Sequence, residues 1–219
     1  MISIVMITMN EQDAVGKVIT DIKKVVPSAE IVIVDSSKDK TAEIAEELGA
    51  KVIKQIPPKG YGPAMDLALR SATGDVIVTL DCDDTYPVDK IPVLADKILK
   101  DGFDIIDASR LKSKPKFMPW INYLANWGFA KIASVLFLKN FTDLHSGMRA
   151  YRKTMIDKLK FDNRGVSLPV ELLLKPIKYG YKYDYIFIEY KERIGVSKLE
   201  PLRAAWWTVK RILGVRFCK

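Results

Sequence analysis

Runs of consecutive apolar residues alternate with segments whose apolar residues recur every three or four positions, from residue 3 to residue 108. The first pattern is typical of strands buried on both faces, and the second of helices that pack one side against a sheet. The patterns predict strands at 3–8, 31–34, 51–56, 76–80 and 103–108 and helices at 15–26, 41–48, 65–72 and 91–99, with Thr41 capping the second helix. The predicted fold class is therefore α/β, a mostly parallel sheet flanked by helices.

Two segments in the second half have a different pattern. Residues 117–138 hold a single charge, Lys131, in 22 positions and are rich in aromatic side chains. Lys131 leaves uncharged runs shorter than the roughly 20 residues that span a bilayer, so we expect helices that are buried or lie in an interface. Residues 202–217 place one helical stripe of apolar side chains beside basic residues: Leu202, Trp206, Val209, Leu213 and Phe217. This pattern is typical of a membrane-surface helix, although an ordinary terminal helix that packs on the domain shares it.

The composition is that of a folded globular protein, with 48% hydrophobic and 28% charged residues. The start lacks a secretory signal pattern, and Cys82 and Cys218 lie far apart, so we expect a reducing, cytoplasmic setting. The net charge is +8, and the last 29 residues carry eight basic residues against two glutamates. Such an end predicts either a phosphate-rich partner or a solvated helix face. Nucleic acid is the least favoured partner, because the aromatic residues of this end lie on an apolar stripe.

Three aspartates crowd the segment TLDCDDTYP, residues 79–87, directly after an apolar strand pattern. In sheets of this class ligands bind at the carboxyl ends of the strands, an edge that should also carry residues 8–13 and 35–40. In an extended segment Asp81 and Asp83 project to one side, where two carboxylates suit Mg²⁺ or Mn²⁺ on a diphosphate. Cys82 projects to the other side and is expected to be a small buried hydrophobe.

The same segment allows two other interpretations. Aspartates are common in polar turns that cap a helix. The order D-x-D-x-T also resembles haloacid-dehalogenase-type phosphatases, in which Asp81 would accept the phosphoryl group and Asp83 would act as general acid. That motif usually follows the first strand, whereas three strand–helix units precede it here, and no paired-acid motif follows downstream.

Further motifs run in order along most of the chain. They are ITMNE (7–11), IVDSSKDKT (33–41), KGYGPA (59–64), ATGD (72–75), DCD (81–83), SR (109–110), DLHSGMRAY (143–151) and RIGVSKL (193–199). Together they resemble the inverting, nucleotide-sugar-dependent glycosyltransferases of the GT-A (Rossmann-like) fold. Within that group they resemble the dolichyl (polyprenyl) phosphate sugar synthases, of the dolichol-phosphate mannose synthase type.

The resemblance implies a role for each matching position. The nucleotide-sugar would contact Thr8, Asn10, Glu11, Asp35, Lys59, Gly60, Gly62, Asp81, Cys82, Asp83 and Arg110. The acceptor would contact Asp143, Ser146, Glu171, Arg193 and Lys198. Asp81 and Asp83 would hold Mg²⁺ or Mn²⁺, and Asp81, Asp83, Arg193 and Lys198 would carry catalysis.

The implied reaction is attack of a polyprenyl-phosphate oxygen on the sugar C1 of a UDP- or GDP-sugar, with inversion and release of the nucleoside diphosphate. The implied organisation is a single domain over 1–200, with a nucleotide-sugar-binding half at 1–110 and an acceptor-binding half at 111–200. A basic amphipathic membrane-surface helix follows at 201–219, so we expect a cytoplasmic enzyme that associates peripherally with the membrane. A non-lipid acceptor, the phosphatase and a degenerate transferase that only binds membranes remain as alternatives.

Overall fold

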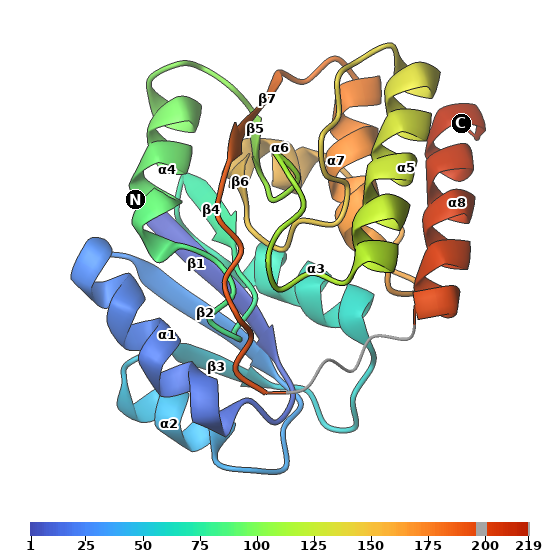
Figure 1. Cartoon of the computed structure of the whole chain (residues 1–219). Coiled ribbons are helices and arrows are strands. Elements are labelled where there is room, and N and C mark those ends of the chain that lie inside the picture. Colours follow the sequence, from blue (N-terminus) through green and yellow to red (C-terminus); the bar gives the residue numbers. More distant parts are fainter. Residues whose placement is uncertain (196–200, 219) are drawn as a thin grey trace.

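The computed structural model describes residues 1–195 and 201–218, and its first half contains every strand and helix that the hydrophobic pattern predicts (Figure 1). The boundaries shift by a few residues. The elements are β1 (Ile2–Thr8), α1 (Gln12–Val25), β2 (Glu30–Asp35), α2 (Thr41–Glu47), β3 (Lys51–Lys54), α3 (Tyr61–Ser71), β4 (Val76–Thr79), the short helix η1 (Val88–Lys90), α4 (Ile91–Leu99) and β5 (Ile105–Ser109).

The second half continues the same sheet and adds the helices of one flank. Its elements are α5 (Trp120–Phe137), β6 (Arg149–Arg152), α6 (Lys153–Lys158), α7 (Leu168–Lys178), β7 (Tyr183–Phe187) and α8 (Pro201–Phe217). The predicted helices of 117–138 and 202–217 therefore both form, as α5 and α8.

The seven strands form one sheet in the order β3-β2-β1-β4-β6-β5-β7. All neighbours are parallel except β6, which runs antiparallel to both β4 and β5. The prediction of a mostly parallel sheet is thus confirmed. The carboxyl ends of β1, β2, β4, β5 and β7 meet at one edge as a result, and this edge carries the candidate site. The sheet joins strands from both predicted halves, and the division into donor and acceptor halves stays a prediction.

Alternate side chains of each central strand enter two different hydrophobic layers. Ile4 and Met6 of β1 pack with helices α1 and α4 on one face of the sheet. Val5, between them, packs with α3, α7 and α8 on the opposite face. Both faces are therefore covered, which is why the strands read as unbroken apolar runs.

The predicted cap of α2 is wrong. Thr41 is the first residue of the helix, and the preceding Lys40 makes no side-chain cap. The Thr41 hydroxyl instead accepts a hydrogen bond from the Glu11 N–H at 2.9 Å and donates to Asp39 at 2.5 Å. Its hydroxyl therefore ties the loop after β1 to the start of α2 instead of capping the helix.

Candidate active site

Thr8 and Asp35 end the neighbouring parallel strands β1 and β2, in register with each other. The Thr8 hydroxyl donates to Asp35 Oδ1 at 2.6 Å, and the Ser37 N–H donates to Asp35 Oδ2 at 3.0 Å. The Ser37 hydroxyl adds a second bond to Oδ1 at 2.5 Å. Asp35 is only 1% exposed, so these donors fix a buried carboxylate while leaving Oδ2 capacity for one more donor.

Asn10 joins the loops that follow these two strands. Its N–H donates to the Ser37 hydroxyl at 2.8 Å, and its side-chain Oδ1 accepts from the Lys38 N–H at 2.9 Å. Asn10 lies at φ 56°, in the left-handed region that asparagine tolerates better than most residues. Thr8, Asn10 and Asp35, which the resemblance places at the nucleoside, therefore lie together at the ends of β1 and β2.

The glycine-rich segment before α3 lies beside the same edge. Gly60 has φ 96°, which favours glycine, and the Lys59 N–H donates to Gln55 Oε1 at 3.3 Å. A Cβ on Gly62 would lie 1.8 Å from the backbone oxygen of Asn163. Gly62 is therefore required by a close backbone approach within the fold. Donor contacts of Lys59, Gly60 and Gly62 stay predictions.

The segment that we call the acidic turn, residues 81–85, follows β4. Its Asp83 is only 2% exposed. Asp83 Oδ1 accepts from the Thr85 N–H at 3.1 Å and from the Thr85 hydroxyl at 2.6 Å. Thr85 thus fixes the orientation of the Asp83 carboxylate, a role that the sequence interpretation missed although the Asp-x-Thr spacing is typical of such a turn. Asp84, at φ 61°, points away to an ion pair with Lys17 at 2.8 Å.

Asp81 lies against Gly147, in the loop before β6. A Cβ at Gly147 would meet the Asp81 carboxyl oxygens at 2.3 and 2.7 Å, so only glycine leaves room for this side chain. Burial and the neighbouring Asp83 charge raise the pKa of Asp81 to about 7. Asp81 makes no hydrogen bond or ion pair with another described residue, so its carboxylate oxygens are available to a ligand.

The donor set of the turn fits a hard divalent cation. Two carboxylates with converging charge, Asp81 and Asp83, supply oxygen ligands of the kind that Mg²⁺ and Mn²⁺ prefer. The part of the chain that the structure describes holds no cluster of three or more His, Cys, Asp or Glu side chains that could hold a metal. A cation here would therefore need further ligands from a diphosphate or from water.

Cys82, between the two carboxylates, is 3% exposed and belongs to the hydrophobic layer under α1 and α4. The expectation that it faces inward is confirmed. Burial also raises the pKa of its thiol, which leaves a protonated and unreactive side chain. If Cys82 contacts the nucleotide-sugar, it would do so through its backbone atoms.

Arg193 reaches the acidic turn from the other end of the chain. Its Nη1 lies 2.9 Å from Asp83 Oδ2, and its Nη2 lies 3.4 Å from Glu11 Oε1. Glu11, Asp83 and Arg193, which the resemblance assigned to different parts of the site, are thus adjacent in space. Lys198, predicted beside Arg193, lies outside the described residues.

Arg110 and Asp143 form a bidentate ion pair under the site. Arg110 Nε lies 2.7 Å from Asp143 Oδ2, and Nη2 lies 3.0 Å from Oδ1. Burial opposes ionisation of Asp143, but the Arg110 guanidinium outweighs it and holds the carboxyl pKa below its usual value. Arg110 also lies over the Tyr190 ring. The ring of Tyr86 packs edge-on against Tyr190, and the Tyr86 hydroxyl oxygen accepts a hydrogen bond from the Gly147 N–H at 2.7 Å. Both aromatic contacts were missed from sequence.

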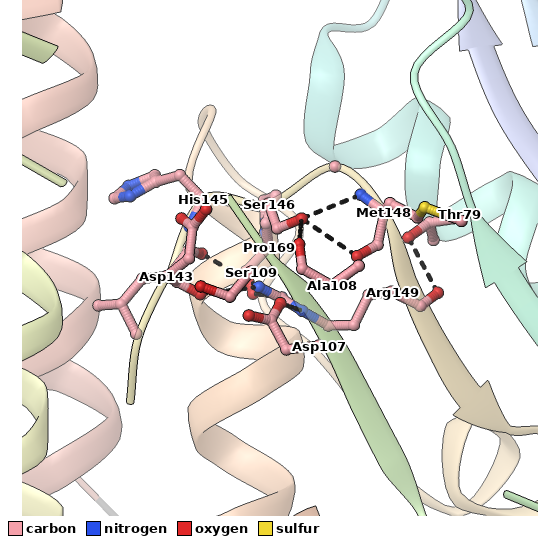
Figure 2. A network of polar contacts seen from close by, with 12 residues as sticks. Thr79, Asp107, Ala108, Ser109, Asp143, His145, Ser146, Met148, Arg149 and Pro169 are labelled. Atoms are coloured by element: carbon pink, nitrogen blue, oxygen red, sulfur yellow. Dashed lines mark hydrogen bonds and ion pairs between the residues drawn. The ribbon is translucent and has the colours of Figure 1, made fainter. Parts of the chain in front are cut away.

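Figure 2 shows the polar network that fixes the loop 143–149 on the sheet. The Ser146 hydroxyl donates to the Ala108 carbonyl at 2.6 Å, and Arg149 Nε lies 2.6 Å from Asp107 Oδ1. Arg149 is fully buried and also donates to the Pro169 carbonyl at 2.7 Å. Ser146 therefore holds backbone in place here, and its acceptor role stays a prediction.

Glu171, the remaining predicted acceptor residue, lies in α7 and is 3% exposed. It forms an ion pair with Arg211 of α8, and Lys175 Nζ lies 3.1 Å from its Oε1. These contacts bind α8 to α7, so the structure gives Glu171 a packing role. Contact with an acceptor stays a prediction.

The fold resembles solved glycosyltransferases of the GT-A class. Glucosyl-3-phosphoglycerate synthase from Mycobacterium tuberculosis, crystallised with Mn²⁺, UDP and glucosyl-3-phosphoglycerate, superposes with a TM-score of 0.80 at 19% identity, over 98% of this chain and 79% of that one. The same enzyme crystallised with Mn²⁺, UDP and phosphoglyceric acid gives a TM-score of 0.81 at 18% identity, over 100% and 79%.

Two archaeal relatives are similar in sequence. A dolichyl-phosphate hexose transferase of Haloferax volcanii is 40% identical over 98% of this chain and 93% of its own length. A dolichol-phosphate mannosyltransferase of Pyrococcus furiosus is 30% identical over 91% of this chain and 59% of its own length.

The sheet order and the acidic turn after β4 thus belong to a glycosyltransferase of the GT-A fold. The model of glycosyl transferase family 2 matches residues 3–160, and the chain belongs to that family. The similarities give the phosphatase interpretation no support.

Proposed function

We propose that the chain transfers a sugar from a UDP- or GDP-sugar to dolichyl or another polyprenyl phosphate, with inversion at the sugar C1. The observation that carries the proposal is the convergence of Asp81, Asp83 and Arg193 at the carboxyl edge of the sheet, where a diphosphate and its cation would complete the charge balance. The 40% identity to a dolichyl-phosphate hexose transferase supports the lipid-phosphate acceptor.

Asp81 and Asp83 would hold Mg²⁺ or Mn²⁺, which supplies positive charge against the developing charge of the leaving nucleoside diphosphate. Thr85 keeps Asp83 oriented for that task, and Gly147 leaves space for Asp81. Asp35, Thr8 and the neighbouring loop would bind the base and ribose. Arg193 is the cation placed to contact the diphosphate, whereas Arg110 orders the loop beneath through Asp143.

The acceptor needs little or no general base, because a phosphate monoester is already largely ionised near neutral pH. Two buried carboxylates near the site are paired with basic side chains and are therefore not placed to act as a general base. Asp143 is committed to Arg110, and Glu171 to Arg211 and Lys175. Rate enhancement would then come from positioning and charge neutralisation by this chain's own residues.

We further propose that the protein works at the cytoplasmic surface of a membrane, to which it binds peripherally. No helix in the part of the chain that the structure describes is long and apolar enough to cross a bilayer. The helices α5 and α8 lie side by side on one flank of the molecule (Figure 1). Their outward faces carry large apolar side chains: Trp120, Ile121, Leu124, Val135, Leu202, Trp206, Leu213 and Phe217.

The test is a transfer assay with a panel of radiolabelled UDP- and GDP-hexoses, Mn²⁺ or Mg²⁺ and dolichyl phosphate. The expected result is lipid-extractable label with at least one donor. No such label from folded protein with any donor would contradict the proposal. Label on a water-soluble acceptor would identify the non-lipid alternative, and phosphate release from simple monoesters without a donor would identify the phosphatase.

A further inference from the structure

Arg193 occupies the position at Asp83 that a bound divalent cation would need. Its guanidinium Nη1 lies 2.9 Å from Asp83 Oδ2, the carboxyl oxygen that Thr85 leaves free. A cation that binds Asp83 through this oxygen therefore competes directly with the guanidinium.

The segment that carries Arg193 is held to the acidic turn by its backbone as well. The Lys191 N–H donates to the Thr85 carbonyl at 2.9 Å, and the Ile194 N–H donates to the Asp83 carbonyl at 3.0 Å. These bonds do not involve the Arg193 side chain. The guanidinium can therefore leave Asp83 by side-chain rotation alone, while its backbone stays beside the site.

The pairing is also incomplete, which favours exchange. Arg193 Nε is buried and has no hydrogen-bond partner within the described residues. The second contact, from Nη2 to Glu11 Oε1, is long at 3.4 Å, and the side chain is 32% exposed. A released guanidinium would keep Glu11 within reach and would lie next to the predicted diphosphate position.

Charge balance gives this exchange a direction. Without a cation, Asp81 and Asp83 place two negative charges on one turn, and Arg193 neutralises the charge of Asp83. When a divalent cation arrives, it supplies the positive charge, and Arg193 in turn gains an anionic partner only if a diphosphate is present.

We infer that Arg193 is a built-in counter-ion of the acidic turn, which a divalent cation displaces from Asp83 and which then pairs with the donor diphosphate. The inference rests on the proposed function for the identity of that diphosphate. It predicts that the cation alone binds weakly. It also predicts that the cation and the diphosphate bind cooperatively, so that each raises the affinity of the protein for the other.

The experiment measures Mn²⁺ binding by calorimetry, without sugar or lipid, to the wild type and to Arg193→Gln. Loss of the competing cation should tighten Mn²⁺ binding roughly tenfold, as expected for a close charge pair near a protein surface. Saturating UDP should tighten Mn²⁺ binding to the wild type by a larger factor than to Arg193→Gln. Arg193→Lys, which keeps the charge, should stay close to the wild type.

Lys191→Gln is the matched control, since it removes one exposed positive charge two residues away and leaves Asp83 paired. Its Mn²⁺ affinity should change less than about twofold. Adding Asp83→Asn to Arg193→Gln should abolish the gain. Unchanged or weaker Mn²⁺ binding by Arg193→Gln, an equal gain in Lys191→Gln, or no Mn²⁺ binding by either protein would overturn the inference. Because no transfer is measured, a failed transferase assay does not affect this outcome.

Discussion

Thr85 and Gly147 are the residues that shape the acidic turn. Thr85 holds Asp83 through two hydrogen bonds, and Gly147 leaves room for the Asp81 carboxylate where a Cβ would collide with it. Any side chain at position 147 would collide with the Asp81 carboxyl group in this arrangement. The two carboxylates are therefore positioned by neighbours on the turn itself and on the loop before β6.

His145 lies in that same loop and is partly buried, with its Nε2 2.8 Å from the Thr208 hydroxyl of α8. Figure 2 shows its ring projecting away from the Asp107–Arg149 pair. Burial is the largest cause that lowers the pKa of His145, and the charges of Arg110 and Arg149 add to it against the raising effect of Asp143. The resulting pKa is about 4. The neutral imidazole is thus the form that the folded protein accepts.

Folding stability should therefore fall as pH falls below the unfolded-state pKa of about 6.5, because the unfolded chain binds a proton that the folded chain excludes. The loss begins near pH 6.5 and is complete once the pH passes below the folded-state value of about 4. Between pH 7 and pH 5 it should reach about 2 kcal/mol. Urea unfolding at the two pH values measures it.

His145→Gln is the control for this prediction, since its side chain is neutral throughout and can still bond Thr208. Its free energy of unfolding should lack the His145 component between pH 7 and pH 5. An equal pH dependence in the wild type and in His145→Gln would show that His145 is not excluded from protonation by the fold.

The site could be predicted from sequence only in part. Asp35, Asp81 and Asp83 follow apolar strand patterns, so their shared edge follows from the sheet alone. Arg193 came from motif order, since nothing local links it to a residue 110 positions away. Tyr86 and Tyr190 were missed because their roles depend on which loops the fold brings together. The Thr85 bonds to Asp83 are local, and their Asp-x-Thr spacing was a signal that the sequence interpretation did not use.

At the scale of elements, α8 carries its apolar stripe outward. The predicted stripe residues Leu202, Trp206 and Phe217 are 89%, 66% and 67% exposed. The buried side of the helix instead contains Thr208, Arg211 and Ile212, with Arg211 paired to Glu171 of α7. A helix of an ordinary globular domain buries its apolar stripe, so this reversal favours a partner that is itself apolar.

Helix α5 extends the same surface. Arg216 near the end of α8 donates to the Leu136 carbonyl near the end of α5 at 2.8 Å, so the two helices run in parallel. Their amino ends therefore lie at the same end of the flank, where Trp120, Ile121 and Trp206 are exposed. Tryptophan beside basic residues suits the boundary between lipid headgroups and acyl chains.

Replacing Leu202 and Trp206 by serine should weaken binding to vesicles that contain anionic lipid by at least about tenfold. The reason is that the transfer of one large apolar side chain from water into the bilayer contributes roughly 1–3 kcal/mol. Folding should be unaffected, since both side chains are exposed. Cosedimentation with vesicles measures the change.

The matched control is Val93→Ser, an exposed apolar position on α4, on the opposite face of the sheet. It should bind vesicles like the wild type. Equal loss in both proteins, or no loss in the double variant, would contradict membrane contact through the α5 and α8 surface.

The strands and α-helices that the sequence patterns did not predict lie in the second half and are β6, α6, α7 and β7. Strand β6 has only four residues, and its Arg149 and Arg152 read as surface positions. Arg149 is nevertheless fully buried, because Asp107 of β5 neutralises it. Because charged residues of a buried ion pair interrupt the apolar run, the hydrophobic pattern does not predict such a strand. The helices α1 and α4, in contrast, have apolar residues at helical spacing along their whole length.

At the scale of the whole molecule, two surfaces carry the residues that the proposed function uses. The carboxyl edge of the sheet gathers the acidic turn, Asp35 and Arg193, and one flank gathers the outward faces of α5 and α8. The loop 143–149 lies between them, since Gly147 contacts Asp81 and His145 contacts α8. A membrane-bound acceptor could then meet a donor held at the edge of the sheet.

The most direct test of this account compares the formation of labelled polyprenyl-phosphate sugar by the wild type, Asp81→Asn, Asp83→Asn and Asp84→Asn, with Mn²⁺ and after its removal by chelation. Asp84 is the matched control, because it is paired with Lys17. The account predicts that chelation, Asp81→Asn and Asp83→Asn each lower the rate by at least about 100-fold, whereas Asp84→Asn stays within about threefold. Lipid-linked product formed at an undiminished rate by Asp83→Asn, or after chelation, would contradict it.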